Sequence, residues 1–315
     1  ADGSLGIHSM KEREKWLMDI LKEIQDLMPD LTRTQKRIAK YILDNPDAVC
    51  FLPLKKLSDE IGVTETTILN FCKKTKAETF SGLKKAMHGY LQDRMRWNNK
   101  LETSSKRYAA DKVTLTGLQQ SQLQLMQATM DGVDVNALFE FVDALSQAEN
   151  IYICGHAASL TIAGSLQHKL RDTGALTRLV NVADYAEVLD ALTRFDENDV
   201  FILITLPFYS AQTVAISDYL RRENAVVLAM TDKLSSPIVR NARHTLLCSS
   251  DSMIFHNSIA SMAAMADIIA SLYILQNKQV FEAYNSKVKL IEDFFKTSTI
   301  PAFDNEYYFN DKGNE

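Results

Sequence analysis

Apolar residues in the first third of the chain recur every three to four positions, which is the spacing of amphipathic helices. Pro29 and the pair Asn45-Pro46 are placed to end the first two helices, and Thr32 is a suitable N-cap for the second. No strand pattern interrupts this region. We therefore expect an all-α domain with helices at residues 11–28, 32–44, 54–61, 65–74 and 81–96.

From residue 150 the pattern changes to short, continuous apolar runs, which are typical of strands buried on both faces. The runs occupy residues 151–154, 200–204, 226–230 and 245–248, with a weaker one at 178–180. Amphipathic segments separate them, at 158–173, 184–194, 211–223, 235–242 and 256–276. Strands that alternate with helices predict an α/β domain with a doubly wound parallel sheet. Such sheets bind ligands beyond the carboxyl ends of their strands, at the topological switch point.

Two more helices, 114–131 and 135–148, are predicted ahead of the first strand, and a polar stretch at 97–112 precedes them. Residues 1–9 are typical of a vector-derived leader, so they do not enter the fold prediction. The predicted organisation is a helical domain at 11–96, a linker and connecting helix at 97–134, an α/β domain at 135–290 and a C-terminal tail at 291–315.

The net charge of −5 is unevenly distributed along the chain. Residues 31–100 contain 14 Lys and Arg against 7 Asp and Glu, whereas residues 101–315 contain 17 against 26. A basic module joined to an acidic body is the expected charge distribution of a nucleic-acid-binding protein.

Composition narrows the class of protein further. Hydrophobic residues make up 46% and charged residues 24%, which is ordinary for a globular protein. No apolar run reaches the ~18 residues of a membrane span, so we expect no membrane partner. The cysteines are isolated and lack CxxC spacing, so we expect neither disulfides nor a metal site, no cofactor, and a cytoplasmic location. They are Cys50, Cys72, Cys154 and Cys248.

Residues 54–74 (LKKLSDEIGVTETTILNFCKK) have the pattern of a helix-turn-helix motif. Leu57 and Ile61 share one face of the first helix, and Gly62 permits the tight turn. The second helix exposes short polar side chains near its start and cations further along, as a recognition helix requires. A plain helical hairpin with a solvated face gives the same pattern. The predicted DNA contacts are Lys55, Lys56, Thr64, Thr66, Thr67, Asn70, Lys73 and Lys74, with Asn70 placed to pair with adenine.

Residues 31–96 resemble the N-terminal domain of the RpiR family of regulators. The resemblance rests on the stretches LTRTQKRIAKYILDNPD, LKKLSDEIGVTETTILNFCKKT and FSGLKKA. The chain has Asn70 where the family usually has arginine, which implies an altered base preference. The resemblance implies a partner, double-stranded operator DNA, and we expect at least a dimer because two-fold operators need a dimeric reader.

Two loops that follow predicted strands have the residues of an anion site. Gly155 and Ser159 (in GHAAS) lie between the predicted strand at 151–154 and the helix that follows it. Hydroxyl side chains at 205–213 lie between the predicted strand at 200–204 and its following helix. Free N–H groups at a helix start favour a phosphate or carboxylate. Simple N-capping by Ser210 or Thr213, and solvent exposure of His156, are alternative interpretations. The predicted ligand contacts are Gly155, His156, Ser159, Thr205, Tyr209, Ser210, Gln212, Thr213 and His256.

Residues 135–275 resemble the sugar isomerase (SIS) domain. The matching motifs are GHAAS, SAQT at 210–213 and TDKLSSP at 231–237. Ala157 and Ala211 each replace a glycine of the usual pattern, which narrows the space for a phosphate. The resemblance implies a small effector, a phosphorylated or acidic sugar.

We therefore expect a transcriptional regulator with no catalytic residues, whose operator affinity responds to a small metabolite. Two alternatives are a phosphosugar isomerase, because the SIS domain also supports that chemistry, and a ligand-independent dimeric DNA-binding protein. Isomerisation needs a positioned base, and His156 and His256 are the histidines in the predicted strand-end loops.

Overall fold

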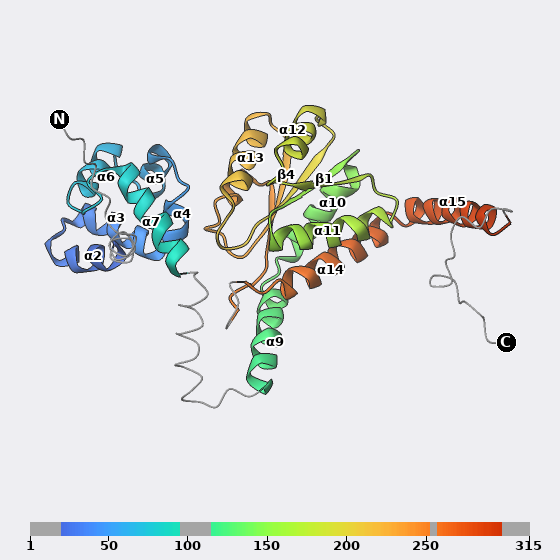
Figure 1. Cartoon of the computed structure of the whole chain (residues 1–315), viewed down its shortest axis with the longest axis horizontal. Coiled ribbons are helices and arrows are strands. Elements are labelled where there is room, and N and C mark those ends of the chain that lie inside the picture. Colours follow the sequence, from blue (N-terminus) through green and yellow to red (C-terminus); the bar gives the residue numbers. More distant parts are fainter. Residues whose placement is uncertain (1–19, 95–114, 253–256, 298–315) are drawn as a thin grey trace, which may run out of the picture.

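The computed structural model describes residues 20–94, 115–252 and 257–297, which form a helical body and an α/β body (Figure 1). The helical body buries one apolar cluster, to which its helices contribute residues such as Ile38, Leu57 and Phe71. Its elements are α2 (Ile20–Leu27), the 3-10 turn η1 (Met28–Asp30), α3 (Arg33–Asp44), α4 (Pro46–Val49), α5 (Leu54–Ile61), α6 (Glu65–Cys72) and α7 (Phe80–Arg94).

The helix ends predicted for this body follow from side-chain capping. Thr32 caps α3 in a reciprocal arrangement with Gln35, which confirms its predicted role. Helix α3 ends just before the Asn45-Pro46 pair, as expected, but a four-residue helix, α4, then begins at Pro46. Proline fits the first position of a helix because that position needs no N–H donor.

The α/β body is built on a five-stranded parallel sheet. The strand order is β2-β1-β3-β4-β5, so β2 is added on one side of β1 and the later strands on the other. The topological switch point therefore lies between β1 and β3. Ile151 pairs with Thr177 on one side and with Val200 on the other. The strands are β1 (Ile151–Gly155), β2 (Thr177–Asn181), β3 (Val200–Ile204), β4 (Val226–Thr231) and β5 (His244–Leu247).

Helices cover both faces of this sheet, which confirms the predicted doubly wound fold. One face packs against α10 (Val135–Gln147), α11 (Ala158–Arg171) and α14 (Ala260–Gln276). The other face packs against α12 (Tyr185–Arg194) and α13 (Ala211–Arg222). Because both faces are covered, β1 and β3 are buried throughout, and their sequences are continuous apolar runs.

Two segments differ from the prediction. The segment 235–242 was expected to be a helix, but it contains only a 3-10 turn, η2 (Val239–Asn241). Proline at 237 lies inside that segment and disfavours a helix there. A helix that the pattern did not predict, α15 (Lys278–Thr297), follows α14.

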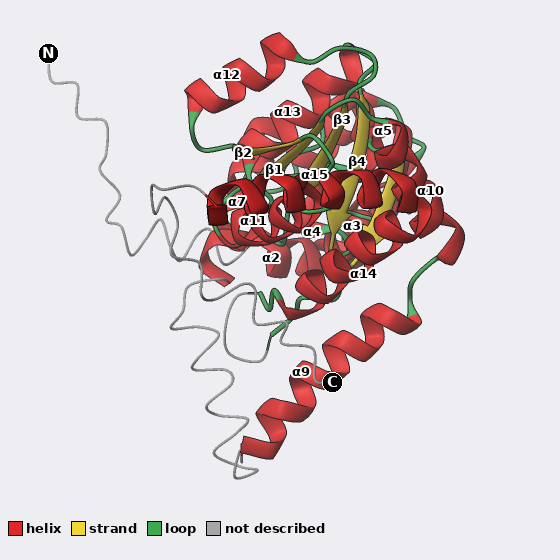
Figure 2. Ribbon diagram, turned by 90° about the vertical axis from the view of Figure 1, so that its right-hand side faces the viewer, coloured by secondary structure: helices red, strands yellow, loops and turns green. Residues whose placement is uncertain are grey.

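Two helices project from the α/β body. Helix α9 (Leu115–Asp131) extends away from it in both Figure 1 and Figure 2, and its C-terminal part contacts α14. Helix α15 extends in another direction and exposes Val280, Leu290, Ile291, Phe294 and Phe295. These helices carry apolar side chains that the described part of one chain does not cover.

The four cysteines are buried, two in each body. Burial raises the pKa of the Cys72 thiol to about 11 and that of Cys248 to about 12. The described residues contain no group of three or more His, Cys, Asp or Glu that could hold a metal ion. None of the described helices is both long and apolar enough to cross a membrane.

Candidate functional site

Helices α5 and α6 form the predicted helix-turn-helix. Gly62 ends α5 with φ +70°, a left-handed conformation that favours glycine, and Thr64 then caps α6 by accepting from the Thr67 amide. Arg37 of α3 donates to the backbone carbonyls of Ile61 and Gly62, so a side chain from a third helix holds the turn in place. Sequence reasoning missed this role of Arg37.

The outward surface of α6 matches a recognition helix in its chemistry. Thr66 and Asn70 are exposed, whereas Ile68 and Phe71 lie in the core. Leu69 is also exposed, at 39%, although the sequence analysis did not single it out. An apolar side chain on such a surface can contact a thymine methyl group.

The predicted phosphate-contacting lysines are all exposed on α5 or at the end of α6. Lys55 and Lys56 are exposed on α5, and Lys73 and Lys74 are exposed at the end of α6. The Lys74 ammonium donates to the side-chain oxygen of Gln35, 3.1 Å away. This surface therefore combines short polar groups, one apolar group and peripheral cations.

The junction between β1 and α11 holds the first proposed ligand residues. Gly155 has no room for a side chain, because a Cβ atom there would lie 2.7 Å from the backbone of Ser159 and Leu160. Ala157 adopts φ +49° and ψ −121°, in the left-handed region, and makes no side-chain cap to α11. Ser159 is buried and His156 is exposed. The start of α11 thus lies beside a strained residue, and its Ser159 and Leu160 amides donate to the His156 and Ala157 carbonyls, each at 3.0 Å.

The loop after β3 carries a second strained residue beside the predicted hydroxyls. Phe208 adopts φ +87°, and Ser210 caps α13 by accepting from the Thr213 amide. The Ser210 hydroxyl also donates to Gln212, at 2.9 Å. Thr213 is fully buried, and its hydroxyl has no hydrogen-bond partner among the described residues. Ser210 therefore does perform the N-cap role that we considered as an alternative to ligand binding.

Tyr209 points into the protein rather than into solvent. Its side chain is 1% exposed, and its hydroxyl donates to the Asp232 carboxylate at 2.7 Å. Burial raises the pKa of Asp232, although the hydrogen bond from Tyr209 acts in the opposite direction. Asp232 lies in the TDKLSSP motif, yet sequence reasoning gave it no role, because nothing in the local pattern indicates its contact with Tyr209.

The sheet brings some of the predicted ligand residues together. Strands β1 and β3 are hydrogen-bonded neighbours, so the loops that carry Ser159 and Ser210 leave the same edge of the sheet. Thr205 also leaves that edge but is buried, and its amide donates to the Met230 carbonyl. The segment after β5 is joined to the same loop, because the Asn257 side chain donates to the Pro207 carbonyl at 3.0 Å. His256 lies outside the described residues.

Comparison with protein-family models identifies both bodies. Residues 18–94 match the helix-turn-helix domain of the rpiR family, and residues 144–275 match the SIS domain. The fold and these matches define a two-domain, DNA-binding transcriptional regulator with a SIS domain. The chain belongs to the RpiR family.

Curated relatives carry the same description. A protein of Haemophilus influenzae is 26% identical over 73% of this chain and 79% of its own length. A protein of Clostridium perfringens is 22% identical over 86% of this chain and 97% of its own length. Both are named HTH-type transcriptional regulators.

Solved structures share the fold. The Vibrio vulnificus NanR protein, solved with ManNAc-6P, has a TM-score of 0.61 at 15% identity and covers 87% of this chain and 98% of its own. The sugar isomerase domain of an RpiR transcription factor from Sphaerobacter thermophilus has a TM-score of 0.53 at 19% identity, over 55% of this chain and 97% of its own. At these identities the likeness concerns the fold.

Proposed function

We propose that this regulator binds operator DNA through α6 and that a sugar phosphate, held at the ends of β1 and β3, modulates its operator affinity. The effector site is supported above all by the hydroxyl of Thr213 at the start of α13, which is buried and has no hydrogen-bond partner among the described residues. A buried hydroxyl without a partner costs about 1–3 kcal/mol, so a ligand oxygen that pairs with it would recover this cost.

The surroundings of Thr213 suit an anion. The start of α11 has no side-chain cap, and the positive end of the helix dipole there attracts negative groups. Two of the four described non-glycine residues with positive φ, Ala157 and Phe208, lie in these two loops, whereas Glu78 and Asn224 lie elsewhere. Backbone strain of this kind is common at ligand-binding sites. NanR, which has this fold, was solved with ManNAc-6P, and this supports a sugar phosphate as the class of effector.

A thermal-shift screen over sugar phosphates, with ManNAc-6P included, tests the effector site. A ligand that binds only the folded chain at one hundred times its Kd stabilises it by about 2.7 kcal/mol and raises Tm. Thr213→Val should abolish the shift, because valine keeps the shape but removes the hydroxyl. Ser217→Ala is the matched control, since Ser217 is a buried hydroxyl of the same helix that already donates to the Val214 carbonyl. An equal Tm shift in wild type and Thr213→Val would contradict the proposed site.

We also propose that the chain acts without catalysing isomerisation of its ligand. Aldose–ketose isomerisation needs a base beside the reacting carbons. The described loops after β1 and β3 contain no Glu, and His156 is exposed. The expected result is no turnover of any sugar phosphate that raises Tm, measured by product analysis after prolonged incubation. Detectable turnover that His156→Ala abolishes would favour the isomerase.

A further inference from the structure

An aromatic contact joins the helical domain to the loop after β3, residues 205–210, which we call the effector loop. Phe51, between α4 and α5, lies edge-on to Tyr209, with ring centroids 6.2 Å apart and an angle of 71° between the rings. Phe51 packs against the core of its own domain and also against the α12–α13 side of the α/β core. One side chain thus joins two apolar cores.

A small cavity beside this contact has walls from both domains. Its volume is about 80 Å³, and it is lined by Tyr41, Leu52 and Glu60 from the helical domain and by Leu234, Ser235, Ser236, Pro237 and Arg240 from the α/β domain. The pKa of Lys84 on α7 is lowered, mainly by burial and in part by the positive charge of Arg240. The cavity and the effect of Arg240 on Lys84 therefore place residues of α3, of the α4–α5 connection, of α5 and of α7 against residues 234–240. Figure 1 shows α4 and α5 on that side of the domain.

Hydrogen bonds connect this contact surface to the effector loop. The Tyr209 hydroxyl donates to Asp232, and the Thr231 hydroxyl lies 3.3 Å from the same carboxylate oxygen. Thr231 also bonds Ser236 at 2.8 Å, and Ser236 lines the cavity. A shift of Tyr209 would therefore disturb both its contact with Phe51 and the segment that faces the helical domain.

The position of Tyr209 in the loop makes such a shift a natural consequence of binding. Its neighbours are Phe208, which has a strained backbone, and Ser210, which caps α13. A group that approached Ser210 and Thr213 would act on a loop that is already strained, and strained residues of this kind are found in ligand clamps and switch regions.

We propose that the helical domain docks on the loop after β3, with Phe51 resting on Tyr209, so that the conformation of this loop and the position of the helix-turn-helix are coupled. The consequence for the effector rests on the proposed function, because it requires the ligand to bind at Ser210 and Thr213. Coupling is reciprocal, so docking influences the loop as much as the loop influences docking.

Hydrogen–deuterium exchange on the full chain without any ligand tests the coupling. Phe51→Ala should speed exchange of residues 205–213 by about three- to tenfold, the range that one aromatic contact supports. Phe80→Ala is the matched control, because Phe80 packs against the helical core alone. Faster exchange at 205–213 in Phe51→Ala but not in Phe80→Ala would support the proposal. Unchanged exchange there, with α3 still protected, would overturn it.

The reverse experiment covers the case in which Phe51→Ala does not fold. Tyr209→Ala should speed exchange of residues 49–53, which lie in the other domain. Phe195→Ala is its control, since Phe195 packs on Phe201 in the same core. No change at 49–53 in Tyr209→Ala would overturn the coupling. Because no ligand is added, these results are independent of the thermal-shift screen, so the docking and the effector site can fail separately.

Discussion

Ala157 and Phe208 hold left-handed backbone conformations at the ends of neighbouring strands, and neither is glycine. A side chain in such a conformation costs of the order of 1–3 kcal/mol. The SIS pattern usually has glycine at the first of these positions, so this chain keeps the backbone geometry while carrying a methyl group there. The site is therefore strained at the two loops that we assign to the effector.

Replacing Ala157 with glycine should relieve part of this strain. We expect the free energy of unfolding to rise by about 1 kcal/mol, because the relief outweighs the added entropy of the unfolded chain. Chemical denaturation measures the change. Ala158→Gly, one residue further into α11, is the control and should lower the free energy of unfolding by about 0.5–1 kcal/mol. The same sign in both variants would show that the conformation of Ala157 is not strained.

At α6, one residue is predicted to read a base and another to contact phosphate. Asn70→Ala should cost about 1–3 kcal/mol of binding free energy on an operator selected from random duplexes, and little on unrelated DNA.

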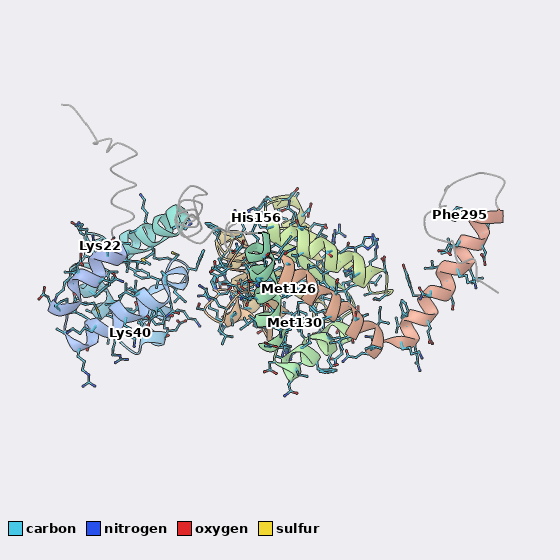
Figure 3. The ribbon with its side chains drawn as sticks, turned by 90° about the horizontal axis from the view of Figure 1, so that it is seen from below. Lys22, Lys40, Met126, Met130, His156 and Phe295 are labelled. Carbon is cyan, nitrogen blue, oxygen red and sulfur yellow. The ribbon has the colours of Figure 1, made fainter. Side chains whose placement is uncertain are left out.

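Lys73→Ala should weaken binding to the operator and to unrelated DNA equally and lower the salt slope by about one unit. Lys22→Ala is the control for charge, because Lys22 is an exposed cation on α2 (Figure 3). Filter binding at several salt concentrations separates the three. Equal losses for Asn70→Ala on both DNAs would contradict base reading.

At the scale of elements, α13 begins with two hydroxyls that do opposite things for stability. Ser210→Ala removes an N-cap and should lower the free energy of unfolding by about 1 kcal/mol. Thr213→Val removes a buried unpaired hydroxyl and should raise it by about 1 kcal/mol. Denaturation of the two variants without ligand gives both signs. If Thr213→Val is destabilised as Ser210→Ala is, the Thr213 hydroxyl already has a partner.

The elements that the sequence predicted well are those with a strong local cause. Strands β1 and β3 are buried on both faces, so their composition alone identifies them, whereas the edge strand β2 exposes Leu179 and its apolar run is weaker. The caps Thr32 and Thr64 also depend on neighbours within three residues. In contrast, α15 makes few contacts with the body and none of its described side chains is buried, and we did not predict it although its apolar residues recur at helical spacing.

The candidate site was harder to predict, because its geometry depends on distant residues. The hydroxyls at 210 and 213 follow from the sequence, but the burial of Thr213 depends on packing of α13 against the sheet. Tyr209 was expected to contact ligand, yet the structure turns it toward Asp232, 23 residues further along the chain. Local patterns carry no information on such a pairing.

At the scale of the whole molecule, α9 exposes apolar side chains that no other described part of the chain covers. Leu118 and Leu123 are exposed on α9 and share one face of this helix with Gln119, Gln122 and Met126. Most apolar residues of α14, by comparison, are already buried within the chain. We therefore propose α9 as the dimer contact.

Light scattering at micromolar concentration tests this contact. The wild-type chain should have at least the mass of a dimer, and Leu123→Glu should shift it toward the monomer because a charge is costly at an apolar interface. Leu176→Glu is the control, since Leu176 is 67% exposed against 64% for Leu123 but lies beside β2. A monomeric wild type, or equal effects of both substitutions, would contradict a dimer formed through α9.

The burial of the four thiols has a practical consequence for measuring how each domain opens. Cys50 and Cys72 belong to the helical core, whereas Cys154 and Cys248 belong to the α/β core. A thiol reagent modifies the thiolate, which burial suppresses, so each pair reacts only when its own domain opens. The rate at which a mild alkylating agent modifies each pair, read by peptide mass, would therefore give the opening free energies of the two domains separately in the untouched wild-type chain.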